Sequence, residues 1–139
     1  MNAEVRLPLT VYYDASCPMC ASEIHALARA SSGENLRLVD CSHKEFDDTL
    51  FVAEGISRDS MMSRLHTRDA RGRWLVAMDA YEAMYSAAGF SGIARVWGSS
   101  RLRPLLDWIY IRVARHRQTI SRLGMHHLVR WFVARYRRS

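Results

Sequence analysis

The sequence predicts an α/β domain with a small sheet, followed by a C-terminal helical extension. Over the first 100 residues, short segments rich in β-branched and aromatic residues alternate with helical patterns. Two cysteines spaced C-x-x-C stand where the first strand gives way to the first helix. Residues 1–100 carry 10 Lys and Arg against 13 Asp and Glu, whereas residues 101–139 carry 10 Arg against the single Asp107. We therefore expect a domain over residues 1–100 and a basic extension over residues 101–139 that packs on it.

Local patterns define the first two strands and the helix between them. Residues 7–13 are short and rich in β-branched and aromatic side chains, as in a buried strand. Residues 17–30 place apolar side chains at helical spacing, with Pro18 at the first helical position and Cys20 on the apolar face. Residues 36–40 form the second strand, which should lie parallel to the first because a helix joins them by a right-handed crossover.

The remaining elements of the domain complete a recognisable order. They are a weak helix, a helical turn, two antiparallel strands and a capped helix, expected over residues 44–54, 57–62, 64–68, 73–77 and 79–88. The loop from Asp69 to Gly72 predicts the hairpin. Asp79 and Glu82 form a capping-box pattern, and Gly89 stops the helix. The order is β-α-β-α-β-β-α, which is the order of the thioredoxin-like fold.

Two amphipathic helices are expected in the extension, over residues 102–116 and after Gly124. Their apolar contacts with the domain should be Leu102, Leu105, Leu106, Ile109 and Val113, then Met125, Val129, Phe132, Val133 and Tyr136. The simplest interpretation has the arginines facing water. A peripheral contact with an anionic membrane surface is an alternative. Nucleic acid is the least favoured partner because no recognised binding motif accompanies the charge.

The cysteine content bears on the cellular compartment. The sequence shows no charged-then-apolar leader and no run near the roughly 18 apolar residues that span a bilayer. We therefore expect a cytoplasmic protein, in which thiols stay reduced and cysteine pairs are catalytic or metal-binding. The odd number of cysteines, three, argues against a structural disulfide framework.

Cys17 and Cys20 are expected to act as a redox pair with different roles. Only the thiolate is nucleophilic, and the unpaired N–H groups and dipole at the helix start should lower the pKa of Cys17. Helical phase leaves Cys17 exposed and turns Cys20 inward, so Cys17 is the expected nucleophile and Cys20 the resolving thiol. For Asp14 two interpretations stay open, namely acceptor of the Cys20 proton or turn carboxylate at the helix start.

Cys41 and His43 open a zinc alternative. They follow the second strand, and parallel strands end at the same edge of a sheet, so they are positioned to meet Cys17 and Cys20 in a Cys₃His set. A helical pattern continues through Ala21, where zinc knuckles usually have glycine, and a second C-x-x-C is missing. We therefore expect no metal and no cofactor, and we expect Cys41 to be a small buried residue.

The segment Tyr13-Asp14-x-x-Cys17-Pro18-x-Cys20 resembles the signature of the DCC family of thiol-disulfide oxidoreductases, named for a D-x-x-C-x-x-C pattern. Softer agreements over residues 9–121 are Leu65-His66, Asp69-x-x-Gly72, Met78-Asp79-Ala80, Pro104, Tyr110 and Ala114-Arg115-His116-Arg117. The resemblance implies a thioredoxin-like fold and disulfide reductase activity, with Cys17 and Cys20 as the active pair and Asp14 beside them.

The chain departs from related patterns in two respects. Ala15 and Ala77 stand where the family usually has glycine, and a turn that needs a positive φ at Ala15 would be strained. Thioredoxins and glutaredoxins also place a cis-proline before the third strand, which none of the three prolines Pro8, Pro18 and Pro104 matches. The backbone that docks substrate must therefore differ, and we expect it at residues 60–63.

The expected function is that of a thiol-disulfide oxidoreductase of the protein-disulfide reductase type. Its substrate would be a disulfide-containing protein or a small-molecule thiol. One alternative is a zinc-stabilised binding module built on Cys17, Cys20, Cys41 and His43. The other is a redox-inert adaptor whose basic tail binds a membrane or nucleic acid.

Overall fold

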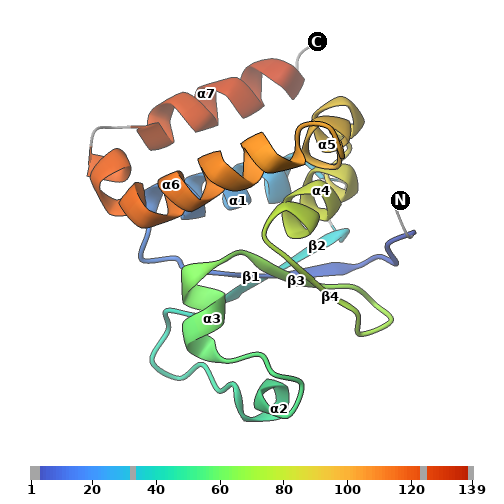
Figure 1. The fold of residues 1–139 in the computed structure, drawn as a ribbon, viewed down its shortest axis with the longest axis vertical. Coiled ribbons are helices and arrows are strands. Elements are labelled where there is room, and N and C mark those ends of the chain that lie inside the picture. The colour runs from blue at the N-terminus through green and yellow to red at the C-terminus, as the bar shows by residue number, and fades with distance from the viewer. Residues whose placement is uncertain (1–3, 32–33, 123–124, 138–139) are drawn as a thin grey trace.

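The computed structural model describes residues 4–31, 34–122 and 125–137, and these contain a four-stranded mixed sheet (Figure 1). The strands, β1 (Leu9–Tyr13), β2 (Leu36–Asp40), β3 (His66–Arg68) and β4 (Trp74–Val76), lie in the order β2-β1-β3-β4. β1 runs parallel to β2 and antiparallel to β3, which pairs with β4. The predicted α/β class with a thioredoxin-like order is confirmed.

Helices cover both faces of the sheet (Figure 1). The larger helical layer contains α1 (Pro18–Ala30), α4 (Met78–Ala87), α5 (Ser91–Trp97), α6 (Arg103–Arg122) and α7 (Met125–Arg137). The opposite face carries the short helices α2 (Thr49–Val52) and α3 (Arg58–Ser63). Within the described ranges, none of the helices has the length and apolar character needed to span a bilayer.

The side chains of β1 point alternately to the two faces of the sheet, and each face has its own hydrophobic core. Leu9 and Val11 have no exposed surface and belong to the larger core, beneath α1 and α4. Tyr12 points to the opposite face, where it packs with Cys41 and Met61 in a smaller core. Because successive side chains of a strand point to opposite faces, β1 is the element around which both cores form.

The start of α1 follows the sequence prediction. Cys17 is the N-cap residue with an extended backbone, and Pro18 occupies the start of the first turn. The helix ends at Ser31, whose N–H donates to the carbonyl oxygen of Leu27 at 2.9 Å. The junction of β1 and α1 therefore places the C-x-x-C pattern at the N-terminus of a 13-residue helix.

The helix predicted for residues 44–54 is mostly wrong, because α2 comprises only four residues. Asp47 accounts for the late start. Its carboxylate accepts hydrogen bonds from both the N–H (2.9 Å) and the hydroxyl of Thr49, and this local turn competes with a helix. The helical turn predicted for residues 57–62 is present as α3, where Ser57 and Ser60 form a capping box.

The capping box predicted at Asp79 is wrong. α4 begins at Met78 with Ala77 as its N-cap, so Asp79 lies within the first turn, where its carboxylate pairs with Arg103 at 2.6 Å. Ala77 has φ 55° and ψ −119°, a backbone conformation that residues other than glycine rarely adopt. Gly89, with φ 90°, follows the helix as predicted.

The apolar stripe predicted for the first C-terminal helix is right in part, because Leu106 and Val113 are partly buried. Leu102, Leu105 and Ile109 are exposed. The packed face also carries Tyr110, whose hydroxyl oxygen accepts the N–H of Leu65 at 2.9 Å. α6 also extends beyond the predicted end at residue 116. The periodicity of apolar residues predicted a helix here. It did not show which side of the helix faces the domain, because both sides of α6 carry apolar residues.

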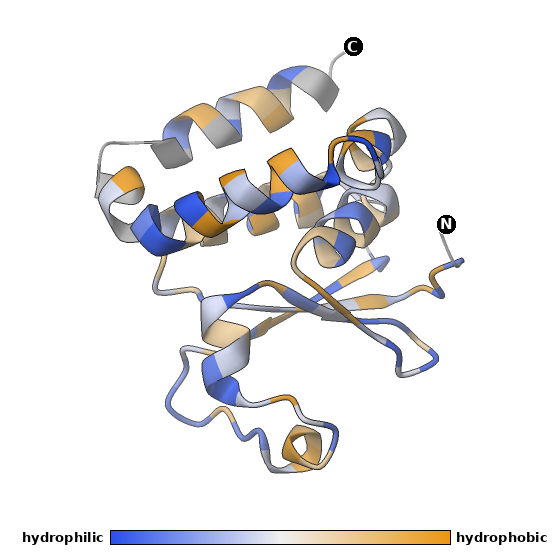
Figure 2. Ribbon diagram, viewed as in Figure 1, coloured by the Kyte–Doolittle hydropathy of each residue, from blue (hydrophilic) through white to orange (hydrophobic). Residues whose placement is uncertain are grey.

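The last helix, α7, packs along α1, and its Val133 is buried in the larger core. Phe132, which was predicted on the packed side, is half exposed. The other predicted contacts of this helix, Met125, Val129 and Tyr136, have side chains outside the described part of the structure. Figure 2 shows that hydrophobic and hydrophilic residues alternate along α6 and α7.

Candidate redox site

Cys17 and Cys20 lie at the first turn of α1, directly after the chain leaves β1. Both cysteines are thiols, and the Cys20 thiol donates a hydrogen bond to the sulfur of Cys17. The two sulfurs are therefore neighbours in space as well as in sequence. This proximity is what thiol–disulfide exchange within a C-x-x-C pair requires.

The surroundings separate the proton affinities of the two thiols. The pKa of Cys17 is lowered to about 6, chiefly because the Cys20 thiol donates to its sulfur. The backbone N–H of Cys20 and the guanidinium of Arg117 lower it further, while burial opposes the change. The pKa of Cys20 is raised because Cys20 is the donor in this hydrogen bond and because it is buried. At neutral pH the site therefore holds a Cys17 thiolate beside a protonated Cys20.

The predicted exposure of the two cysteines is wrong. Cys17 has no exposed surface, whereas Cys20 is partly exposed. Helical phase within α1 shows which way a side chain points from that helix, but it cannot show what a distant segment places over it. α6 contacts α1 and brings Arg117 to both thiols. Reaction at the Cys17 sulfur consequently needs a local displacement of the groups that cover it.

Asp14 is a buried carboxylate with partners on both of its oxygens. Its Oδ1 accepts the N–H of Ser16 at 2.9 Å and the Ser16 hydroxyl at 2.5 Å. Its Oδ2 lies 2.9 Å from Nη2 of Arg117. These contacts are those of the turn carboxylate, one of the two roles predicted for Asp14, and they join the turn between β1 and α1 to α6. The role of proton acceptor stays a prediction.

Glu23 is a second carboxyl group at the site. It lies three residues beyond Cys20 on α1, and the hydroxyl of Tyr85 in α4 donates to its Oε1 at 2.5 Å. Burial raises the pKa of Glu23, the hydrogen bond from Tyr85 opposes the rise, and the charge of Cys17 adds to it. The Glu23 charge also raises the pKa of Cys20, so this carboxyl interacts with both thiols.

A small pocket opens beside Cys20. Its volume is about 60 Å³, and it is bounded by α1, by α3 with the segment before β3, and by α6. Side chains that line it include Asp14, Cys20, Ser63, Leu65, Tyr110 and Arg117. Ser63 belongs to the segment 60–63 expected to dock substrate, and docking at this segment stays a prediction.

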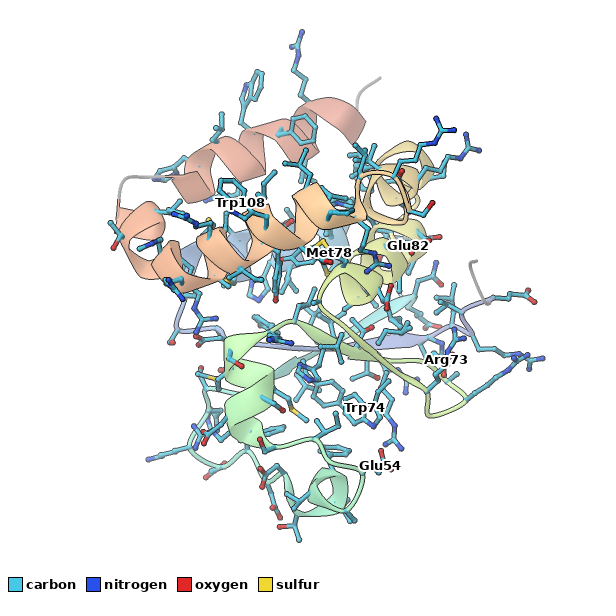
Figure 3. The ribbon with its side chains drawn as sticks, viewed as in Figure 1. Glu54, Arg73, Trp74, Met78, Glu82 and Trp108 are labelled. Carbon is cyan, nitrogen blue, oxygen red and sulfur yellow. The ribbon has the colours of Figure 1, made fainter. Side chains whose placement is uncertain are left out.

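The predicted zinc alternative is wrong for the set that includes Cys41 and His43. The Cys41 thiol lies in the smaller core, 3.6 Å from Sδ of Met61, and burial raises its pKa to about 12. His43 is exposed, and its Nδ1 accepts the N–H of Glu45. Among the residues that the structure describes, no group of three or more His, Cys, Asp or Glu side chains is arranged to hold a metal ion. Cys41 belongs to the smaller core, and Trp74, labelled in Figure 3, packs against that core.

The strain expected from a missing glycine lies at Ala77 and not at Ala15. Among the described residues other than glycine, Ala77 has a positive φ and Ala15 does not. The N–H of Ala15 donates to Oδ1 of Asp40 at 3.2 Å, which ties the turn before α1 to the end of β2. The Leu7–Pro8 peptide bond is cis and precedes β1, whereas the cysteines follow the other end of that strand.

Arg117, Tyr110 and Glu23 are site residues that the sequence interpretation did not assign. Arg117 and Tyr110 both fall in segments that resemble the DCC family, so the resemblance offered a signal for them. Glu23 stands three residues after Cys20, a spacing that places two side chains on the same side of a helix. This spacing was a local signal for a carboxyl group near Cys20.

Comparison with known proteins agrees with the geometry of the site. The family model of DCC1-like thiol-disulfide oxidoreductases matches residues 11–123. This segment runs from β1 through α6, and it includes both thiols and Arg117. Searches of the curated proteins and of the solved structures found no match. With most of its length matched to this one model, the chain belongs to the family of DCC1-like thiol-disulfide oxidoreductases.

Proposed function

We propose that the protein reduces disulfide bonds by thiol–disulfide exchange through Cys17 and Cys20. The observation that carries the proposal is the Cys17 thiol, whose pKa is lowered to about 6 beside a Cys20 thiol that stays protonated. A nucleophile that is ionised at neutral pH and a resolving thiol in contact with it are the two components that such a reaction needs. The family match supports oxidoreductase activity in general.

In the first step the Cys17 thiolate attacks one sulfur of a substrate disulfide. A bond forms between Cys17 and that sulfur, the substrate S–S bond breaks, and the second substrate sulfur leaves as a thiolate that takes a proton from solvent. Formation of the mixed disulfide uses up the Cys17 thiolate, which accepted the hydrogen bond of Cys20 and raised the pKa of Cys20. Cys20 is then easier to deprotonate than in the resting protein.

In the second step Cys20 loses its proton and attacks the Cys17 sulfur, which releases the remaining substrate thiolate and leaves a Cys17–Cys20 disulfide. Glu23 is the better placed proton acceptor, because burial raises its pKa toward that of a thiol. Both oxygens of Asp14 are already occupied by contacts with Arg117 and Ser16. A dithiol or glutathione-type reductant then returns the pair to two thiols and is itself oxidised.

The size of the pocket favours a protein disulfide over a small molecule as substrate. A volume of about 60 Å³ holds one small group, whereas sites that enclose a small ligand usually measure roughly 300–1,000 Å³. A disulfide on the surface of another protein needs no enclosed cavity, and it reaches Cys17 once the groups that cover this sulfur are displaced. We place this activity in a reducing compartment such as the cytoplasm, where the three thiols stay reduced.

Redox titration followed by mass spectrometry tests the proposal. We expect a reversible Cys17–Cys20 disulfide with a potential between about −120 and −270 mV. Cys20→Ser should trap a mixed disulfide with a disulfide-bonded substrate protein at Cys17, and Cys17→Ser should not. Cys41→Ser is the matched control, because Cys41 is buried in the other core and should change neither result. If the wild-type pair fails to oxidise over the whole range of potentials, the proposal is wrong.

A further inference from the structure

The two C-terminal helices repeat one surface arrangement. In α6 the guanidinium of Arg112 lies over the ring of Trp108, at 5.0 Å from its centroid. In α7 Arg135 lies over Trp131 in the same way, at 5.7 Å. Both pairs have the spacing Trp-x-x-x-Arg, which stacks the two side chains on one side of a helix. Each helix therefore presents an aromatic ring and a cation together at its surface.

Exposed apolar side chains accompany the Trp–Arg pair on each of the two helices. Trp108 and Trp131 are each more than half exposed, and Figure 3 shows Trp108 on the side of α6 away from the sheet. We define the Trp–Arg face by the exposed residues Leu105, Trp108, Ile111 and Arg112 of α6 and Leu128, Trp131, Phe132 and Arg135 of α7. α6 and α7 contact each other on the outside of the helical layer (Figure 1). Exposed apolar side chains gathered in this number usually mark an interaction site.

A groove of about 400 Å³ borders the same face. It lies between α1 and α7 and is lined by Arg29 and Arg130 together with His127 and Trp131. Arg29 and Arg130 are both exposed. The groove thus offers basic side chains around a space of ligand size, with one of the two tryptophans at its edge.

We propose that the Trp–Arg face docks on the surface of an anionic lipid membrane. Tryptophan and arginine side chains suit the boundary between headgroups and acyl chains, because the ring and the apolar neighbours insert while the guanidinium meets lipid phosphate. Residues 101–139 carry 10 Arg against the single Asp107, a balance of +9 that complements an anionic surface. The groove beside Trp131 receives a lipid headgroup.

The charge and the side chains of the Trp–Arg face favour a membrane over a second copy of the chain and over nucleic acid. Two copies that met through this face would bring together two segments of +9 each, with little acidic charge to neutralise them. Nucleic acid would pair with the arginines but would offer no apolar contact to the exposed side chains Leu105, Ile111 and Leu128. The surface of an anionic bilayer provides both negative charge for the arginines and an apolar interior for the exposed apolar side chains. The opposite side of α6 lines the pocket at Cys20, so docking leaves the redox pair on the protein side of that helix.

Co-sedimentation with lipid vesicles tests the proposal on the full-length protein. One set contains phosphatidylcholine alone, and the other contains phosphatidylcholine with about 30% phosphatidylglycerol. We expect binding to the anionic vesicles that weakens as salt is added. Trp108→Ser/Trp131→Ser should lower the partition coefficient about tenfold. Arg112→Glu/Arg130→Glu should lower it roughly 25-fold or more, since each basic residue near an anionic surface contributes about fivefold.

Matched control variants lie on the other side of the molecule. Leu50→Ser/Val52→Ser removes two exposed apolar side chains from α2, and Arg37→Glu/Arg71→Glu reverses two exposed arginines outside α6 and α7. Both controls should bind anionic vesicles like the wild type. Circular dichroism and the titration of the Cys17 thiol show whether each variant retains its fold and redox site.

Several results would overturn the proposal. Equal recovery with neutral and anionic vesicles, or no recovery with either, excludes docking on an anionic membrane. Equal loss of binding in the control variants shows that this face is not responsible. Self-association that Trp108→Ser/Trp131→Ser abolishes assigns the face to a second copy, and binding to nucleic acid without binding to vesicles assigns it to that partner.

Discussion

The acidity of Cys17 has a local cause and a distant one. The local cause is Cys20, whose thiol and backbone N–H stabilise the Cys17 thiolate from within the same turn of helix. The distant cause is Arg117, which reaches the thiols from α6. Burial works against both. A thiolate can persist in a site without exposed surface only because these neighbours outweigh the loss of hydration.

Arg117→Gln should therefore raise the pKa of Cys17. The substitution removes a positive charge and leaves the Asp14 carboxylate near the thiol without its ion-pair partner, and both changes disfavour the thiolate. We expect the ultraviolet absorbance of the wild-type thiolate to titrate with a midpoint near pH 6 and that of the variant about one pH unit higher. Cys41→Ala should leave the wild-type midpoint unchanged, since the pKa of Cys41 is about 12. Equal midpoints for Arg117→Gln and wild type would contradict the role of Arg117.

Glu23→Gln should slow the second step of exchange and spare the first. The amide has the shape of the carboxyl group but cannot take the proton of Cys20. In quenched reactions with a disulfide-bonded protein, we expect the Cys17 mixed disulfide to accumulate and to decay at least roughly tenfold more slowly than in the wild type. Asp14→Asn is the comparison, and a larger effect there would return the role of proton acceptor to Asp14.

Among the helices, α4 combines an unfavourable start with a favourable end. Ala77 holds a positive φ at the N-cap because its N–H donates to the carbonyl oxygen of Leu65 at 2.9 Å, which anchors the chain beside β3. At the other end, Gly89 has φ 90° and nothing within 4 Å of the position that a Cβ atom would take. Both positions have a positive φ, which glycine adopts at little cost. Gly89 suits this conformation, whereas the alanine at position 77 is strained by it.

Ala77→Gly should stabilise the protein and Gly89→Ala should destabilise it. Relief of a positive φ at a non-glycine residue gains more than the extra chain entropy of glycine costs, so we expect a net gain of about 1 kcal/mol in the free energy of unfolding. At Gly89 a side chain meets no steric obstacle, so the expected loss of about 1 kcal/mol comes from the backbone alone. Urea denaturation measures both. A destabilised Ala77→Gly variant would show that φ at this position is not a source of strain.

The sequence was informative wherever structure depends on neighbours along the chain. β2 occupies residues 36–40 as predicted, and the hairpin of β3 and β4 follows from its glycine loop, because strand and turn preferences act over a few residues. The burial of Cys17 and the contacts of Arg117 depend instead on where α6 lies across α1, and no local pattern contains that information. The spacing of Glu23 from Cys20 was a local signal, but its hydrogen bond with Tyr85 joins residues 62 positions apart and was not predictable from neighbours along the chain.

At the scale of the whole molecule, the last helix joins the domain through a side chain that the structure places in the larger core. Val133 is the described α7 side chain that joins the larger core, where α7 packs along α1. The rest of the described α7 surface is largely exposed. Val133 therefore contributes to the attachment of α7.

Val133→Ala should lower the free energy of unfolding by roughly 2 kcal/mol, through the loss of two buried methyl groups and the cavity that remains. Leu128→Ala, on the exposed side of the same helix, should change it by less than about 0.5 kcal/mol. Denaturation of both variants measures the difference. Equal effects would mean that α7 is attached by other contacts.

The ion pair between Asp14 and Arg117 joins residues more than a hundred positions apart, and this has a consequence for protein synthesis. The C-x-x-C segment leaves the ribosome long before α6 does, because chains emerge from the N-terminus onward. A nascent chain that has not yet released Arg117 lacks the guanidinium that lowers the pKa of Cys17. We therefore expect a higher pKa of Cys17 in a chain that ends before α6 than in the complete protein, so the last quarter of the polypeptide adjusts a thiol near its beginning.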